Sequence, residues 1–202
     1  SVTSQSQKQK GDLYRWYVVG VLTFAYLVSF LDRQILALMV GPIQEDLMLS
    51  DTQISLLMGL AFSIFYIFMA VPLGRLADNS VRRNIIIGGV TLWSLMTAAC
   101  GLAGSYWHLF LARMGVGVGE ASLTPSATSM IADYFPSGAR GKALATYNAG
   151  VSLGTGFAMV FGGLIITYVS TSERHVLPVV GGGAAWPYVF FLVAPPRALV
   201  VL

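Results

Sequence analysis

The chain has 202 residues, of which 55% are hydrophobic and only 10% are charged, and its mean hydropathy is +0.71. This composition excludes an ordinary water-soluble domain and predicts a protein of the lipid bilayer. The net charge of +3 does not indicate a nucleic-acid partner, because the basic residues lie in short segments between apolar stretches. A single cysteine, Cys100, excludes an intramolecular disulfide bond.

Long apolar stretches recur along the chain, and each is long enough to cross a hydrocarbon core as a helix. They are too long and too continuously apolar for the alternating strands of a membrane barrel. We therefore predict an all-α membrane protein with a polar amino-terminal tail, residues 1–15, and six transmembrane helices. The expected spans are residues 16–39, 54–76, 84–105, 107–131, 143–169 and 186–202.

The basic residues of the tail and loops predict the orientation of these spans, because Lys and Arg favour the cytoplasmic side. Eight of them would lie on one side of the membrane, namely Lys8, Lys10, Arg15, Arg75, Arg82, Arg83, Arg140 and Lys142, whereas Arg174 would lie beside Glu173 on the other side. We therefore expect a multi-pass protein of a bacterial inner (plasma) membrane, with its amino terminus in the cytoplasm.

Three ionisable residues fall inside the expected spans. With a rise of about 1.5 Å per residue, Asp32 lies roughly 24 Å from the cytoplasmic face and Arg113 roughly 9 Å below the outer one. Glu120 follows Arg113 by almost two turns, so both occupy one helix face with Glu120 near the midplane. A charge at such depth costs at least about 2.5 to 3.5 kcal/mol, so these side chains should face a cavity or one another.

Desolvation disfavours the charged form of a carboxyl group, and a nearby cation favours it. Glu120 and Asp32 are therefore predicted to load and release protons, with Arg113 determining which of them stays ionised. The alternative is a fixed internal ion pair that only orders the bundle.

Three further residues are candidates for the wall of the cavity. Arg33 follows Asp32 and faces either the same cavity or the outer interface. Tyr26 and Asn148 are the other two, although membrane helices also use such residues for interhelical hydrogen bonds.

Glycines are concentrated in the fourth and fifth expected spans. The segment "GVGVGE", residues 115–120, does not have the spacing of a dinucleotide-binding loop. Within membrane helices, small residues instead let neighbouring backbones approach closely, so we expect these two spans to pack tightly or to bend.

The loop "GRLADNSVRRN", residues 74–84, resembles the loop pattern of the major facilitator superfamily, with Asn79 and Val81 as departures from it. The matching positions are Gly74, Leu76, Asp78, Arg82 and Arg83. The segment "RMGVGVGEA", residues 113–121, is similar to the fourth-helix pattern of the same superfamily. The segments "LDRQ" and "GVGEAS" resemble its spinster branch, whose animal members move sphingosine-1-phosphate and lysolipids.

This resemblance implies a transporter of two six-helix halves with the substrate bound between them. Residues 16–202 would be the N-terminal six-helix domain, with the C-terminal half absent. Gly74, Asp78, Arg82 and Arg83 would form a cytoplasmic gating loop, in which Asp78 pairs with one of the two arginines. The alternative is a solvated loop whose arginines only set topology.

The resulting expectation is a secondary active, proton-coupled transporter of an amphipathic or anionic organic solute, with lysolipids and sphingolipid-like molecules among the candidates. The expected partners are this substrate, protons, membrane lipids and a missing C-terminal half, with no nucleic acid. No catalytic constellation or metal-ligand spacing is present in the sequence, so we expect neither an enzyme nor a cofactor. The alternatives are a half-length structural or regulatory membrane partner, and a uniporter without proton coupling.

Overall fold

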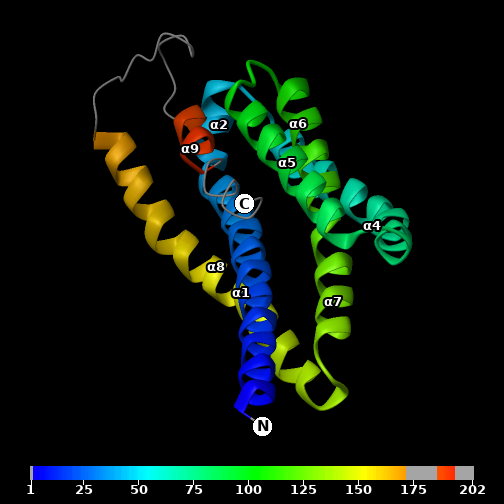
Figure 1. The fold of residues 1–202 in the computed structure, drawn as a ribbon. Coiled ribbons are helices and arrows are strands. Elements are labelled where there is room, and N and C mark those ends of the chain that lie inside the picture. Colours follow the sequence, from blue (N-terminus) through cyan, green and yellow to red (C-terminus); the bar gives the residue numbers. More distant parts are fainter. Residues whose placement is uncertain (1, 172–185, 194–202) are drawn as a thin grey trace.

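The computed structural model describes residues 2–171 and 186–193, and among these residues it contains helices and short connections but no strand (Figure 1). The part of the sixth expected span at 194–202 lies outside the described residues. The elements are α1 (Val2–Leu38), α2 (Val40–Asp46), α3 (Asp51–Ser55), the π-helical η1 (Leu56–Leu60), α4 (Ala61–Asn79), α5 (Arg82–Gly101), α6 (Tyr106–Glu120), α7 (Leu123–Tyr134), α8 (Ser137–Thr171) and α9 (Trp186–Val193).

Three described helical segments are long and apolar enough to cross a membrane, namely Gly11–Leu38, Asp51–Asn79 and Arg82–Gly101. They coincide with the first three expected spans. The fifth expected span lies within α8, and α9 begins where the sixth was expected. Helix α1 also extends back to Val2, so the segment expected as a tail continues the first span as a helix about 55 Å long.

The long helices run alternately between two ends of the bundle (Figure 1). Helix α1 rises from the amino terminus to α2, α6 leads downward into α7, and α8 returns upward. Helix α8 packs mainly against α1, whereas α6 packs against α4 and α5. The buried apolar side chains between these helices form one hydrophobic core.

Glycines explain how closely the helices approach. A Cβ at Gly150 of α8 would lie 2.8 Å from the carbonyl oxygen of Thr23, and a Cβ at Gly117 of α6 would lie 2.7 Å from that of Phe62. Both distances are too short for a real side chain, so only glycine permits these contacts. The tight packing predicted for the fourth and fifth spans is present, and its partners are α4 and α5 for the fourth span and α1 for the fifth.

The fourth expected span, residues 107–131, is not one continuous helix, and the bend expected for it takes the form of a turn between two helices. Helix α6 ends at Glu120, and α7 begins at Leu123 after a turn. Pro125 supplies the physical reason, because it has no N–H to donate to the carbonyl of Ala121 and its ring clashes with that group in a regular helix. The Ser122 hydroxyl donates to the carbonyl oxygen of Gly119 at 2.8 Å and closes the end of α6. Glu120 therefore lies at a helix end in the interior of the bundle.

Candidate functional site

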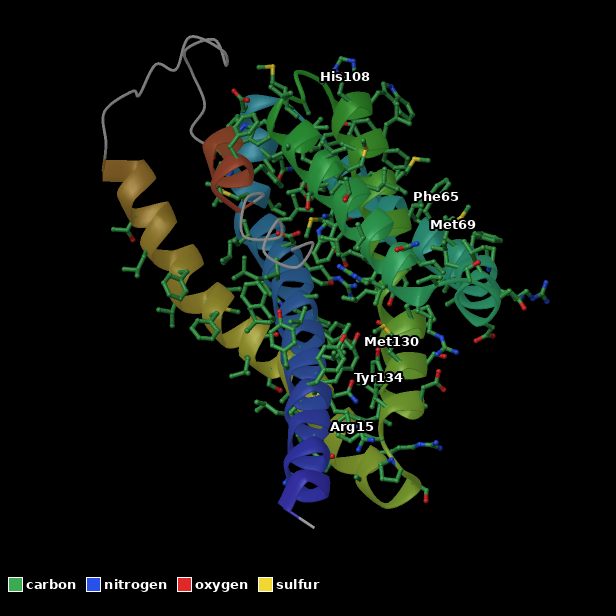
Figure 2. The ribbon with its side chains drawn as sticks, viewed as in Figure 1. Arg15, Phe65, Met69, His108, Met130 and Tyr134 are labelled. Atoms are coloured by element: carbon green, nitrogen blue, oxygen red, sulfur yellow. The ribbon has the colours of Figure 1, made fainter. Side chains whose placement is uncertain are left out.

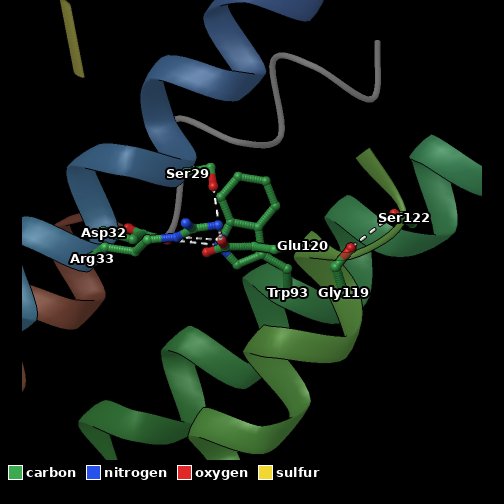
Figure 3. A network of polar contacts seen from close by, with 7 residues as sticks. All are labelled: Ser29, Asp32, Arg33, Trp93, Gly119, Glu120 and Ser122. Atoms are coloured by element: carbon green, nitrogen blue, oxygen red, sulfur yellow. Dashed lines mark hydrogen bonds and ion pairs between the residues drawn. The ribbon is translucent and has the colours of Figure 1, made fainter. Parts of the chain in front are cut away.

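A buried polar network joins α1 to the end of α6 and is centred on Glu120 (Figure 3). The Ser29 hydroxyl donates to Glu120 Oε2 at 2.8 Å, and Arg33 donates to the same oxygen from Nε at 3.0 Å and from Nη2 at 2.7 Å. Ser29 and Arg33 are four residues apart and so lie on one face of α1, which lets both reach one carboxylate. The network is a charge-assisted contact between two helices distant in sequence.

The two members of this ion pair differ in exposure. The Glu120 side chain is 1% exposed, whereas that of Arg33 is 28% exposed. The second carboxylate oxygen, Glu120 Oε1, is buried and accepts no hydrogen bond in the described structure. Three donors therefore converge on one oxygen, and none of the described residues donates to the other.

Asp32, the residue before Arg33, points to a different helix. The indole Nε1 of Trp93 on α5 donates to Asp32 Oδ2 at 2.6 Å, and the Asp32 residue is 5% exposed (Figure 3). The two acids are thus buried close together on α1 and α6, each with its own donors. Trp93 was missed by the sequence analysis, although a tryptophan inside an apolar span needs a partner for its N–H and could have signalled this contact.

Arg113 is buried, as its position predicts, and among the described residues the ion pair to Glu120 is made by Arg33 and not by Arg113. Its guanidinium carbon lies 5.3 Å from the centre of the Phe62 ring, and its Nε has no hydrogen-bond partner. The guanidinium of Arg33 lies 4.6 Å from the centre of the same ring. Phe62 therefore contacts two cations through its aromatic ring. The structure brings Arg33, and not Arg113, into contact with Glu120.

An aromatic cluster continues from this site along α1. The Phe30 ring centre lies 4.8 Å from the guanidinium carbon of Arg33. Tyr26 packs edge-on against Phe30, and Tyr147 of α8 stacks on Tyr26 with 4.6 Å between the ring centres. Tyr26 is thereby linked to the Glu120 network. Asn148 is exposed on α8, and no described contact joins it to this cluster.

The loop between α4 and α5 is arranged differently from the expected latch. Arg82 forms an ion pair with Asp133 of α7, and its Nε donates to the carbonyl oxygen of Ala77 at 3.2 Å. Asp78 and Arg83 are exposed and belong to no ion pair in the described part of the chain. The expected pairing of Asp78 with an arginine is therefore replaced by a contact from α5 to α7.

Gly74, the first residue of the matched loop pattern, lies on α4, where a Cβ would touch the Pro125 side chain at 3.8 Å. That is an ordinary van der Waals distance, so the contact brings α4 against α7 without requiring glycine. Within the described residues, no three His, Cys, Asp or Glu side chains gather in a way that could hold a metal ion.

Comparisons with known proteins place this arrangement among membrane transporters. The model of the Major Facilitator Superfamily matches residues 22–202. An MFS-type efflux pump of Mycolicibacterium smegmatis is 32% identical over 82% of this chain and 38% of its own length. A probable L-galactonate transporter of Escherichia coli is 34% identical over 66% of this chain and 29% of its own length.

A solved structure extends the likeness to the fold. The crystal structure of a bacterial homolog of the human lysosomal transporter Spinster, inward-facing and unoccupied, superposes with a TM-score of 0.82 and 37% sequence identity over 93% of this chain. This chain covers 42% of that one. The chain thus spans less than half the length of the relatives that it matches.

Proposed function

The chain belongs to the major facilitator superfamily and is similar to its spinster branch, and on that premise we propose that it forms the N-terminal six-helix half of a proton-coupled transporter of an organic solute. The complete transporter would work by alternating access, with its substrate between two halves. In this proposal Glu120 carries the transported proton. The observation behind it is a buried carboxylate that has all its donors on one oxygen.

The ion pair between Glu120 and Arg33 supplies a mechanism for coupling. An ionised Glu120 holds the Arg33 guanidinium through two charge-assisted hydrogen bonds. A proton on Glu120 removes the negative charge and so weakens this hold. Arg33 is then free to bind an anionic group, and its partly exposed side chain already reaches beyond the protein interior. Proton uptake and binding of an anionic solute would therefore favour each other.

Asp32 and Arg113 complete the proposed site. Asp32 is the second buried acid and is oriented by the Trp93 indole, so it is a further candidate for proton exchange. Arg113 contacts the same Phe62 ring as Arg33 and contributes a second positive charge near Glu120. This charge favours the ionised acids and opposes protonation. Arg113 would thereby keep the acids ready to release their protons.

The rings around Arg33 support an amphipathic or anionic substrate. Phe30, Phe62 and Tyr66 each lie within 5.4 Å of the guanidinium, so a cationic group is surrounded by apolar surface. Such a surface suits a molecule with an acidic head and an apolar body, which includes lysolipids and sphingolipid-like molecules. Tyr26 would extend this wall, and Asn148 would join it from α8.

The gating loop and the membrane orientation belong to the same proposal. Gly74, Asp78, Arg82 and Arg83 would form a cytoplasmic gate, with the ion pair to Asp133 as its contact in this conformation. Arg15 and Tyr134 lie toward one end of the bundle and His108 lies at the other (Figure 2), which agrees with a basic, cytoplasmic end at the amino terminus. We assign this end to the cytoplasm of a bacterial cell.

The near-complete burial of Glu120 favours one competing function, a fixed ion pair that only orders the bundle. In that case the chain would be a structural half, or part of a uniporter, without proton transfer. Full-length protein in liposomes distinguishes these possibilities through substrate-driven proton flux, with galactonate and a lysolipid as probes.

The Glu120→Gln variant should lose proton flux at every pH while retaining exchange of unlabelled for labelled substrate. Glu45→Gln, which changes an exposed acid, is the matched control and should behave as wild type. Wild-type proton flux in Glu120→Gln across the pH range would refute the proposal.

A further inference from the structure

Two neighbouring cavities lie beside the junction of α4 and α5, away from the residues that contact Glu120. The first has a volume of about 420 Å³ and lies between α4, α5 and the turn from α6 to α7. The second has a volume of about 300 Å³ and lies between the start of α5 and α7. Ser80 and Val81 line both cavities, so the two adjoin, and the pair is called the joined cavity below.

The two cavities differ in chemistry. Aliphatic side chains and glycines form most of the lining of the first, among them Leu76, Ile85, Gly88, Leu92 and Val118. A Cβ at Gly88 would meet no atom within 4 Å, so nothing from the protein fills the space beside it. This part can accept an apolar chain.

The second cavity is more polar than the first and is lined by Arg82 and Arg83, together with Asp133 and Tyr134. The Arg82 guanidinium is already engaged by Asp133 and by a backbone carbonyl. Arg83 is exposed and has no ion pair among the described residues, so its charge is available to a ligand. Tyr134, on the wall of this cavity, lies toward the same end of the bundle as Arg15 (Figure 2).

The spacing along α5 sets the depth of the joined cavity. Gly88 and Leu92 follow Arg83 by five and nine residues, which places them roughly 8 and 14 Å deeper along the helix axis. Arg83 thus lies at the start of α5 in the second cavity, and the apolar first cavity, which adjoins it at Ser80 and Val81, extends deeper along Gly88 and Leu92. Basic pockets between membrane helices bind anionic lipid headgroups for this reason.

We propose that the joined cavity binds a phospholipid with an anionic headgroup, with its phosphate at Arg83 and one acyl chain along Gly88 and Leu92. The lipid comes from the leaflet at the Arg15 end of the bundle. It links α4 to α5 where the connection between them is short and the two helices make few direct contacts. This site is separate from the Glu120 network and does not depend on proton coupling.

The test measures lipid binding to the full-length protein by native mass spectrometry, using phosphatidylglycerol and phosphatidylcholine with identical acyl chains. Phosphatidylglycerol should bind more tightly. Arg83→Gln should weaken its binding about fivefold, the factor expected for one arginine near an anionic surface. The matched control Arg75→Gln changes an exposed arginine that lines neither cavity and should bind as wild type.

A second variant, Gly88→Leu, tests the apolar first cavity by filling it. It should lower the binding of both lipids. The control is Gly20→Leu in α1, because Gly20 is also exposed and has no atom within 4 Å of where a Cβ would lie, and this variant should bind both lipids as wild type does. Equal affinity for the two lipids would overturn the proposal, as would wild-type binding in Arg83→Gln or Gly88→Leu. Arg83 is exposed, so its substitution leaves the fold intact and keeps the headgroup test valid even if the glycine variant is unstable.

Discussion

Two adjacent glycines of α5 should respond in opposite ways to the same substitution. Gly88 has open space where a Cβ would lie. At Gly89 a Cβ would overlap the Ser122 hydroxyl and lie 2.8 Å from the carbonyl oxygen of Gly119. The Ser122 hydroxyl is held by its hydrogen bond to Gly119, and the Gly119 carbonyl belongs to the backbone. Neither group can therefore move away from a Cβ at Gly89 without a shift of α6.

The magnitude follows from these contacts. Replacing glycine by alanine in a helix gains roughly 0.5 to 1 kcal/mol of unfolding free energy, and this gain applies at both positions. Overpacking a tight interior contact costs about 1 to 3 kcal/mol, and this cost applies only at Gly89. The two variants should therefore differ by about 1 to 3 kcal/mol. For a chain of this length, that corresponds to about 2 to 12 °C in thermal midpoint.

The assay is thermal unfolding of the purified protein in detergent. The thermal midpoint of Gly88→Ala should equal or exceed that of the wild type, and the midpoint of Gly89→Ala should be lower than that of the wild type. The added substitution Ser122→Ala removes the overlapping hydroxyl, so it should restore part of the midpoint lost in Gly89→Ala. Equal midpoints for the two single variants would refute the close contact between α5 and the end of α6.

Three further substitutions test the polar contacts. Arg33→Gln removes two of the three hydrogen bonds to buried Glu120, so the unfolding free energy should fall by up to the roughly 3 to 5 kcal/mol typical of a broken buried pair, and the thermal midpoint should fall with it. The added Glu120→Gln should restore much of this loss; no fall, or no restoration, would show that the pair is not ionic. Trp93→Phe removes the indole donor to Asp32, so it should cost about 1.5 to 3 kcal/mol more unfolding free energy, measured in denaturant, in the wild type than in an Asp32→Ala background that lacks the acceptor; equal losses in the two backgrounds would contradict the contact. Asp133→Asn removes an ion pair whose acid is 61% exposed, so the thermal midpoint should change by the equivalent of less than about 1 kcal/mol, and a much larger change would show that this contact holds α5 to α7 more strongly than its exposure indicates.

The sequence was sufficient to predict which residues are buried at depth but not which of them touch. Counting residues from the expected span ends placed Asp32, Arg113 and Glu120 inside the membrane, and all three are buried. The same counting gives no information on the rotation of one helix relative to another. For that reason it could not decide where Arg33 points, and that residue proved to be the partner of Glu120.

The break in the fourth span had a signal in the sequence that hydropathy does not record. Hydropathy alone predicts one span across residues 107–131, although polar residues such as Glu120, Ser122 and Thr124 interrupt its apolar pattern. Pro125 indicates a break near Ala121, because the missing donor and the ring clash act one turn earlier. The consequence for the site is direct, since the break follows Glu120 immediately.

Infrared difference spectroscopy of the reconstituted protein tests proton exchange at Glu120 most directly. Acidification should produce a protonated carboxyl band in the wild type that is absent from Glu120→Gln, and adding a transported substrate should change its intensity. A wild-type spectrum with no band that depends on Glu120 at any pH at which the protein transports would contradict the account.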